Sequence, residues 1–476
     1  MTIDILSSRQ IRQEHETSLQ ILTEIGVKVN HEEVFGLLIE AGATGKESTG
    51  VVKFPVDLIS NSIKTSPRKR ILYGRDFRKK ARFGYDDHLF MSSAGQYLLI
   101  DEREQRRPAT LEDTRDAIRL GDALPEIDIV GPLVLPSEIP VKVRDIHVYA
   151  ELVKNTTKPC FTWINNGTTA DYIIQIFSVL AGGREELRRR PMVEAFIEPI
   201  SPLQFNKEGL EILLKFARAG LPVGFGPMAM ATATAPTTLA GAIAQENAEI
   251  LAGIVISQVI TPGLPVTYWG IPHVMDMATG NISFGSPEQG LMASIMTQLG
   301  RWYGFPVGVN VGLTDSKIAD AQNGIERAAT LVLGAFSGAD IFGHMGIVGA
   351  DQGASLVELV LNNEMAAYLR RITKGITIDS ETLAFEVIKR VGIGGHFLED
   401  DHTLRNFKKE VWISTIMDRL NWETWEKKGR ESIWERALRR KNQILRDHSV
   451  SLLDEKRTKE IDRIVQEADK RILGKG

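Results

Sequence analysis

Short apolar runs recur along the middle of the chain, and each is followed by a polar or glycine-rich loop and then by a segment with helical periodicity. This alternation is typical of parallel strand–helix units. Successive runs begin roughly 29–44 residues apart, which suits a strand, a helix and two loops. The pattern predicts eight strands, at 89–93, 127–136, 158–165, 192–199, 221–228, 265–271, 305–312 and 339–346.

Several of these runs begin with proline, as expected where a strand starts before its first ladder bond, and few contain charges, as expected for strands covered on both faces. An open doubly wound sheet shares this pattern. However, eight similar units without a glycine-rich dinucleotide-binding or Walker turn favour closure. We therefore predict an α/β fold with a (β/α)₈ TIM barrel over residues 86–375.

The segments on either side of the barrel have different patterns. Residues 1–85 predict a small α+β cap, whose first helix carries an apolar stripe and ends at Gly26. Residues 376–476 predict a helical extension with a helix at 381–391, a long charged helix at 405–447 with a break, and another at 452–473. The spacing of apolar residues in this extension favours packing on the barrel or on a second subunit, although a solvated face remains an alternative.

Composition limits the possible roles of the chain. Its 476 residues carry a net charge of −4, which gives no bulk attraction to nucleic acid. The single cysteine, Cys160, excludes an internal disulfide and multi-thiolate metal sites. The N-terminus becomes charged too early for a signal peptide, and Gln245, Glu246 and Glu249 interrupt the most apolar stretch. We expect a cytoplasmic protein that binds neither nucleic acid nor membranes.

Residues that follow the predicted strands should surround the active site, since catalytic groups of such barrels lie at the carboxyl ends of the strands. The set is rich in aromatic and amide side chains and poor in charge, with no obvious lysine nucleophile, metal cluster or pair of carboxylates. Aromatic rings attract quaternary ammonium ions by roughly 0.5–2 kcal/mol per ring, although any single ring could belong to ordinary packing. The candidates for binding a substrate are Tyr97, Trp163, Asn165, Phe196, Phe225, Trp269, Asn310 and His344.

Three histidines are candidates for further roles. His344 lies in the glycine-rich segment FGHMGIVGADQG, where the backbone can approach a ligand, so it could orient a substrate or be a satisfied structural histidine. His396 and His402 lie in the loop GIGGHFLEDDHT and could face a partner or cofactor, or stabilise that loop.

Long collinear segments resemble the trimethylamine methyltransferase family. They are QYLLIDEREQRRPATLEDTRDAIRLGDALPEIDIVGPLVLPSEIP (96–140), NTTKPCFTW (155–163) and GIGGHFLEDDHTL (392–404), with HETSLQILTEIGVKV (15–29) and YGRD (73–76) in support. The likeness spans nearly the whole chain. It implies a barrel that takes a methyl group from an amine and passes it to the Co(I) of a corrinoid, which a separate corrinoid protein supplies. It implies no tightly bound cofactor and no metal of the enzyme's own.

The archaeal founding members of that family carry pyrrolysine in the glycine-rich segment after the last strand, whereas residues 342–353 of this chain are all standard amino acids. The chain is thus similar to the non-pyrrolysine branch, which implies a quaternary-amine demethylase. Glycine betaine, released as dimethylglycine, is the best guess for the substrate, with proline betaine, carnitine or another methylamine as alternatives. A homo-oligomer is expected.

The chemistry of a quaternary nitrogen agrees with this expectation. It leaves as a neutral tertiary amine, so no general acid is needed, and the protein has to orient and desolvate the substrate. The predicted rings would then form a cation box, while His344, Asn165 and Asn310 would hold a carboxylate or another polar tail.

Two other classes of protein remain possible on the sequence alone. A barrel lyase or aldolase would need a Schiff-base lysine, for which Lys317 is the only contender because Lys158 lies at the start of a strand. A non-catalytic binding protein for quaternary amines would show affinity without turnover.

Overall fold

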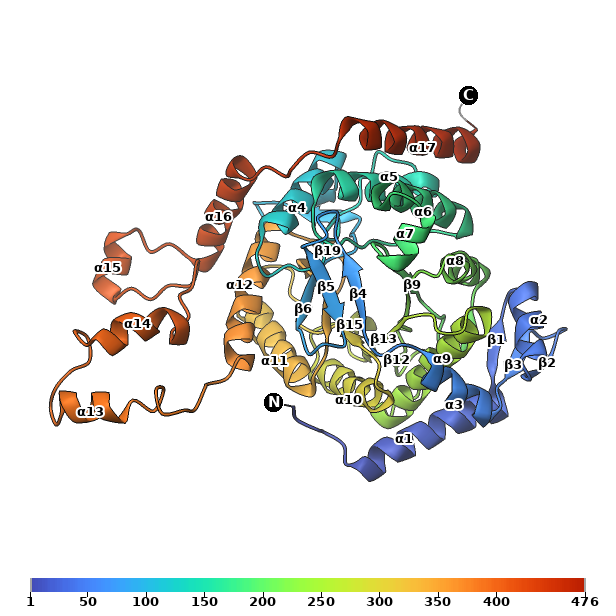
Figure 1. The fold of residues 1–476 in the computed structure, drawn as a ribbon, viewed down its shortest axis with the longest axis horizontal. Helices are drawn as coiled ribbons and strands as arrows, with labels where there is room; N and C mark the ends of the chain where they lie inside the picture. The colour runs from blue at the N-terminus through green and yellow to red at the C-terminus, as the bar shows by residue number, and fades with distance from the viewer. Residues whose placement is uncertain (1, 475–476) are drawn as a thin grey trace.

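The computed structural model describes residues 2–474 and contains a curled parallel sheet inside a ring of helices (Figure 1). Six regular strands form the sheet in the order β6-β17-β16-β13-β11-β9, and every neighbouring pair is parallel. This is the curled α/β sheet that the alternating pattern predicts. The strands are β6 (Leu89–Ser92), β9 (Ala195–Ile197), β11 (Val223–Phe225), β13 (Val266–Gly270), β16 (Val307–Val309) and β17 (Ile341–Met345).

The second and third predicted strands are present only as extended segments with isolated bridges. Met91 pairs with Ile129, and Val130 pairs with Cys160, in the parallel sense. Prolines at 132, 136 and 159 remove backbone donors from these segments, so a regular ladder cannot form along them. The two segments nevertheless continue the curl of the sheet beyond β6.

A hairpin closes the amino end of the barrel. Its strands β4 (Arg70–Tyr73) and β5 (Lys80–Phe83) are antiparallel, and their apolar residues belong to the core inside the sheet. The backbone N–H of Tyr73 donates to the carbonyl of Pro191, and that of Asp76 donates to Thr157. The hairpin therefore joins the segment before β9 to the third predicted strand.

A buried ion pair fixes this hairpin inside the barrel. Arg70 lies 2.5 Å from the Glu194 carboxylate and 3.7 Å from the centre of the Phe83 ring, and Thr267 donates to Glu194 at 2.6 Å. The side chains of Arg70 and Glu194 are 7% and 6% exposed. A charged pair at this depth is stable only while both partners are present.

The helices that follow the strands cover the outside of the sheet. The longest, α9, is apolar enough by length and composition to cross a membrane, yet 83% of its most apolar window is buried inside the protein. Such burial is typical of a core helix. The surrounding helices are α4 (Leu111–Ala123), α5 (Val141–Asn155), α6 (Gly167–Ala181), α7 (Arg184–Arg189), α8 (Lys207–Arg218), α9 (Leu239–Ile260), α10 (Pro287–Tyr303), α11 (Ala321–Ser337) and α12 (Leu356–Thr373).

Short strands decorate the loops at the carboxyl end of the sheet. They form two small sheets, β12-β14-β15 and β18-β19-β7-β8, while β10 joins the sheet of the N-terminal unit. They are β7 (Leu98–Ile100), β8 (Arg106–Pro108), β10 (Gln204–Phe205), β12 (Met230–Ala231), β14 (His273–Asp276), β15 (Asn281–Ser283), β18 (Ile347–Val348) and β19 (Gly353–Ala354).

The N-terminal unit is joined to the barrel through its sheet as well as its helices. Strand β1 pairs in parallel with β10, and helices α1 and α3 pack against α9. The first helix continues through one π-helical turn at Ile21–Ile25 and ends at Gly26. The elements of this unit are α1 (Ser8–Gln20), β1 (Val27–Val29), α2 (Glu32–Glu40), β2 (Thr44–Lys46), β3 (Val51–Lys53) and α3 (Val56–Thr65).

The C-terminal extension differs from its prediction. The long helix expected at 405–447 is instead three helices, and the chain between them is extended because Ser414 and Thr415 bind the carboxylate of Glu364 on α12. Figure 1 shows α13, α14 and α15 outside the ring of helices, whereas α16 and α17 return to it. The helices are α13 (Phe385–Val391), α14 (Asp401–Glu410), α15 (Trp422–Lys427), α16 (Ile433–Asp447) and α17 (Glu455–Leu473).

Replacing Arg70 tests the role of the buried ion pair. Arg70→Met should lower the free energy of unfolding by about 3–5 kcal/mol because it leaves Glu194 buried without a cation. Urea unfolding followed by circular dichroism measures this change. The double variant Arg70→Met, Glu194→Met should recover much of the loss, whereas Arg82→Met, on the exposed face of the same hairpin, should have little effect. Equal stability of the Arg70→Met protein and the wild type would contradict a stabilising role of this ion pair.

Candidate active site

The carboxyl ends of the sheet strands surround one narrow cavity. Its walls are mainly aromatic and apolar, and no Lys or Arg is among the described residues that line it. It therefore offers a cation no competing positive side chain. The lining residues are Met91, Phe161, Trp163, Phe196, Glu198, Met228, Trp269, Ile271, Phe284, Asn310, His344, Ile347 and Asp351.

Four rings form a continuous wall of this cavity. His344 is stacked on Trp163 with their centroids 5.7 Å apart, Trp163 meets Phe196 edge-on at 5.6 Å, and Phe196 meets Trp269 edge-on at 5.6 Å. Phe161 contacts Trp163 and Phe196 at 6.0 and 6.4 Å. These spacings are those of packed aromatic pairs, so each ring is held in place by the next.

Two glycines make room for Trp269 in the middle of the barrel. A Cβ atom on Gly308 would lie 2.3 Å from the Trp269 ring, and one on Gly224 would lie 2.7 Å from its indole nitrogen. Both glycines lie on strands that pair directly with β13. Any other residue at either position would therefore displace the indole.

The alternation of side chains along a strand explains why Phe225 lies elsewhere. Gly224 faces the barrel interior, so its neighbour Phe225 points outward, where its ring packs against Gly253 of α9 and Phe205. Phe225 is fully buried in the layer between the sheet and the helices. It belongs to the core, and this structure places it outside the cavity.

A bulge directs His344 into the cavity. The pairing of β17 with β6 shifts register between Phe342 and Met345, and His344 has a φ of 65°. Positive φ is uncommon for residues other than glycine and often marks functional sites. Ala350 and Asp351, in the loop that follows, share this conformation. The end of β17 is therefore the most irregular part of the cavity wall.

The histidines of the cavity region are neutral at physiological pH. Burial lowers the pKa of His344 to about 4, and it also lowers the pKa of His273 to about 4. His273 packs against Phe284 at 4.4 Å, and neither of its ring nitrogens has a partner. An uncharged imidazole in the wall does not repel a bound cation.

Asn310 brings a free acceptor to the cavity. Its side-chain Oδ1 is buried without a hydrogen-bond partner, while its backbone carbonyl accepts from the side chain of Gln289. An unpaired oxygen in an otherwise apolar wall presents partial negative charge to whatever occupies the space.

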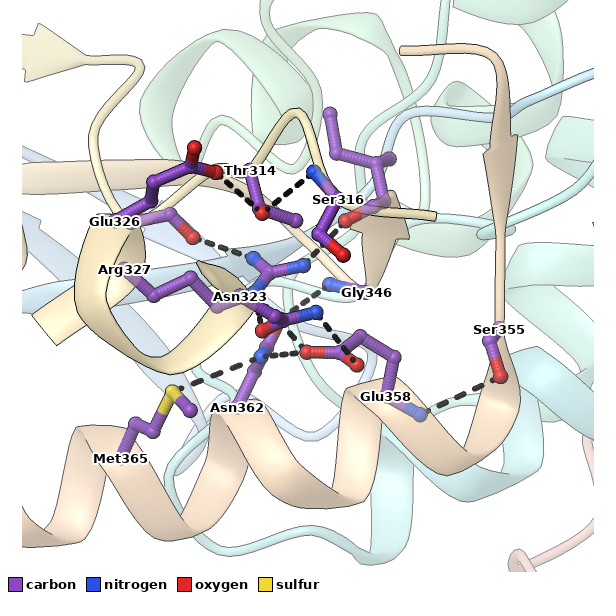
Figure 2. A network of polar contacts seen from close by, with 12 residues as sticks. Thr314, Ser316, Asn323, Glu326, Arg327, Gly346, Ser355, Glu358, Asn362 and Met365 are labelled. Atoms are coloured by element: carbon purple, nitrogen blue, oxygen red, sulfur yellow. Dashed lines mark hydrogen bonds and ion pairs between the residues drawn. The ribbon is translucent and has the colours of Figure 1, made fainter. Parts of the chain in front are cut away.

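A fully buried ion pair between α11 and α12 supports the irregular loops. Arg327 lies 3.0 Å from Glu358, and the two side chains are 0% and 1% exposed. Arg327 also donates at 2.5 Å to the carbonyls of Gly312 and Ile347, one in each of the loops after β16 and β17 (Figure 2). One guanidinium thus fixes the two loops relative to each other.

The same network continues to the residue that follows the bulge. The Asn362 side chain accepts from the backbone N–H of Gly346 at 2.7 Å and donates to Glu358 at 2.9 Å (Figure 2). Because Gly346 lies two residues beyond His344, this contact restrains the strand end that carries the histidine.

Glu246 supports the neighbouring loops in a similar way. Its carboxylate, on the buried face of α9, accepts from the backbone N–H groups of Ala229 and Ile271 at 3.2 and 2.7 Å. Complete burial raises the pKa of Glu246 well above its ordinary value. The charged residue that interrupts the apolar stretch in the sequence therefore holds the ends of two strands.

Two carboxyl groups that sequence reasoning did not select stand at the mouth of the cavity. Glu198 follows β9, and Asp351 follows β17. Both residues are in contact with solvent at the mouth. The surrounding protein nevertheless partly desolvates their carboxyl groups, which raises the pKa of Glu198 to about 7 and that of Asp351 to about 6. Asp351 contributes to the first of these shifts. Their position at two strand ends was the available signal.

The structure brings five of the predicted residues together and places the other five elsewhere. Trp163, Phe196, Trp269, Asn310 and His344 line the cavity. Tyr97 is 61% exposed outside it under the Arg144 guanidinium, and Asn165 donates to the carbonyl of Val141. Those outside the cavity are Tyr97, Asn165, Phe225, His396 and His402. The last two lie in the segment with α13, α14 and α15 outside the ring of helices, which we call the arm.

Lys317 lies in a wider basin at the carboxyl end of the barrel and not in the cavity. Its Nζ donates to the backbone carbonyl of Asp315 at 2.8 Å. Among the described residues no group of three His, Cys, Asp or Glu side chains is arranged to hold a metal. The arrangement as a whole is an aromatic hollow with an acidic mouth, the type of site that binds a small organic cation.

Comparison with known proteins places the chain within one class of barrel methyltransferases. The family model described as "Trimethylamine methyltransferase (MTTB)" matches residues 1–472. The match covers nearly all of the sequence, so this chain belongs to the trimethylamine methyltransferase family.

Its relatives include enzymes with different substrates in their names. A glycine betaine methyltransferase of Desulfitobacterium hafniense strain Y51 is 33% identical over 95% of this chain and 94% of its own length. The trimethylamine methyltransferase MttB of the same species, strain DSM 10664 / DCB-2, is 32% identical over 96% and 92%. MttB of Methanosarcina barkeri strain Fusaro is 29% identical over 99% and 96%.

A solved structure shares the fold. The monomethylamine methyltransferase MtmB of Methanosarcina barkeri superimposes with a TM-score of 0.50 over 94% of this chain and 93% of its own, at 12% sequence identity. The likeness confirms the predicted barrel architecture.

The ring wall predicts affinity for a simple quaternary cation. Trp163→Ala should weaken the binding of tetramethylammonium by about 0.5–2 kcal/mol, or roughly 2–30-fold, because it removes one cation–π contact. Titration of the intrinsic tryptophan fluorescence measures the dissociation constant. Trp302→Ala removes a half-exposed indole far from the cavity and should leave affinity unchanged. Equal affinity of Trp163→Ala and wild type would remove Trp163 from the site.

Proposed function

We propose that this protein moves a methyl group from a quaternary amine to the Co(I) of a corrinoid protein and releases the tertiary amine. The observation that carries the proposal is the aromatic wall of Trp163, Phe196 and Trp269 in a cavity without lysine or arginine. The full-length family match supports the methyl transfer and its corrinoid acceptor.

The reaction needs little from the protein beyond placement. Co(I) supplies an electron pair to the methyl carbon, the C–N bond breaks, and its electron pair stays on nitrogen as a neutral amine. Because the leaving amine is neutral, no proton has to be delivered to it. Good alignment of nitrogen, carbon and metal can supply several kcal/mol of the barrier.

The residues of this chain have distinct tasks in that scheme. The rings hold the ammonium group and exclude water, and the free oxygen of Asn310 faces the same space. His344 stacks on Trp163 as a neutral imidazole and fixes the position of the indole. None of these groups becomes charged or loses a proton during the transfer.

The open side of the cavity is where the acceptor must approach. The loops after β11, β13, β16 and β17 form a wider basin beside the mouth, with Ala350 and Gln352 flanking the cavity residue Asp351. The corrinoid protein would therefore dock over this basin, because the hairpin β4–β5 closes the amino end of the barrel.

We also propose that the protein is cytoplasmic.

We further propose that the protein self-associates through the arm, which lies outside the ring of helices. The arm carries large apolar side chains in contact with solvent, and a second copy brings two identical apolar surfaces together. Light scattering after gel filtration tests this assembly. Those side chains include Ile376, Ile378, Leu383, Phe385, Ile393, Leu398, Leu404 and Trp422.

Methyl transfer to reduced cobalamin tests the proposed reaction. With a panel of quaternary amines, glycine betaine, proline betaine, carnitine and choline among them, we expect the Co(I) absorbance to convert to methyl-Co(III). One tertiary amine should appear per methyl transferred. Trp163→Ala should abolish the transfer with the fold intact by circular dichroism.

The other outcomes separate the alternatives. Binding of quaternary amines without turnover would favour a non-catalytic binding protein. Transfer from tertiary amines alone would contradict the quaternary substrate. Trapping of a keto substrate on Lys317 by borohydride would favour an aldolase, which the hydrogen bond of that lysine to Asp315 does not support.

A further inference from the structure

The mouth of the cavity carries two carboxyl groups, and no lysine or arginine of residues 2–474 lines the cavity beside them. Glu198 follows β9, at one end of the sheet order, and Asp351 follows β17, the second strand from the other end, and both line the cavity. In the basin beside them stand three further acids, Asp276, Glu288 and Asp315. The electrostatic character of the entrance is therefore negative.

The positive groups near the entrance do not neutralise this pair. Lys317, in the basin, donates to the Asp315 carbonyl. Within the described part of the chain, His344 is the one titratable group of the cavity wall besides the two acids, and burial keeps it neutral. Arg144 lies over Tyr97 and donates to the carbonyl of Ile139. A ligand at the mouth meets the two carboxyl groups directly.

The two carboxyl groups differ in how firmly they are held. Asp351 accepts a hydrogen bond from the Gln96 side chain at 2.6 Å and sits at a φ of 66° in the loop anchored by Arg327. The only side chain that shifts the pKa of Glu198 is Asp351, so Glu198 is not committed to a structural partner. One acid is fixed, and the other is free to meet a substrate.

This arrangement limits what can be attached to the ammonium group. The interior of the cavity is walled by Met91, Phe161 and Ile271, where a carboxylate would lose its water without gaining a cation. At the mouth the same carboxylate would face Glu198 and Asp351, and like charges at close range repel one another. An uncharged or hydroxyl-bearing tail meets neither penalty and can donate a hydrogen bond to the acids.

We propose that Glu198 and Asp351 are specificity residues that select quaternary amines without a carboxylate over betaines. Choline-like cations are then better substrates than glycine betaine, although a relative of 33% identity is named for glycine betaine. This inference rests on the proposed function, because it names the class of quaternary amine that the same cavity takes.

A matched pair of compounds tests the inference directly. Glycine betaine and its primary amide have the same trimethylammonium group and nearly the same shape, but only the betaine carries a negative charge. We expect the amide and choline to have a kcat/KM at least about tenfold above that of glycine betaine at pH 8, which corresponds to one repulsive contact.

Isosteric variants should remove the discrimination. Glu198→Gln and Asp351→Asn should each lower the amide-to-betaine ratio by about tenfold, chiefly through a lower KM for the betaine. Asparagine tolerates the positive φ at position 351. Glu198→Asp should keep the ratio, and Glu185→Gln, in helix α7 before the start of β9, is the control that should leave both substrates unchanged.

Lower pH should act in the same direction as the variants. The pKa values of Glu198 and Asp351 are raised to about 7 and about 6, so both are largely ionised at pH 8 and Glu198 is largely protonated at pH 6. The amide-to-betaine ratio of the wild type should therefore fall between pH 8 and pH 6. In Glu198→Gln this fall should be smaller.

Binding separates failure of the inference from failure of the proposed function. Displacement of tetramethylammonium, followed by tryptophan fluorescence, gives relative affinities of the amide and the betaine even if no methyl is transferred. If no methyl is transferred but the amide binds more tightly than the betaine, the proposed reaction is contradicted and the proposed selectivity is supported. Equal or tighter binding of glycine betaine, unaltered by Glu198→Gln or Asp351→Asn, would overturn the inference.

Discussion

The strict alternation of side chains along two barrel strands determines how the interior is layered. In the segment that includes β9, Glu194, Phe196 and Glu198 face the interior in turn, and in β13 and the residue after it Thr267, Trp269 and Ile271 do the same. The first member of each series contacts Arg70 of the hairpin or its partner Glu194, and the second belongs to the aromatic wall. The third lines the cavity nearer the carboxyl ends of the strands. A shift of one residue in either strand would exchange these layers for the residues that now pack against the helices.

Much of this architecture could be predicted from the sequence, since the apolar runs mark the strands and the residues after them mark the site. The cavity-lining positions of Trp163 and Trp269 follow from that rule. The same rule failed for Phe225 because the neighbouring Gly224 takes the inward position, a choice that depends on the space required by Trp269. The helix predicted at 405–447 was too long because helical periodicity does not show that Ser414 and Thr415 bind Glu364, whereas the helix predicted at 452–473 is present as α17.

The charge at the mouth could not be predicted in the same way. Glu198 and Asp351 are far apart in the sequence, and only the curl of the sheet with the bulged end of β17 brings them to one cavity. The sequence placed each at a strand end but gave no reason to pair them, so the site was expected to be poor in charge. Burial raises the pKa of both groups, and for Glu198 the nearby Asp351 adds to the shift, so both effects are properties of the tertiary structure.

Negative charge decreases from the mouth of the cavity toward its interior. This arrangement favours entry of a cationic substrate and departure of a neutral product. Acids at the entrance attract a cation over a distance, while the inner wall offers rings, a neutral imidazole and an amide oxygen. A quaternary substrate gains from both, because its charge persists whatever its surroundings. Once the methyl group has left, the tertiary amine is neutral and loses its cation–π and Coulomb attraction together. The reaction itself therefore weakens the binding of its product.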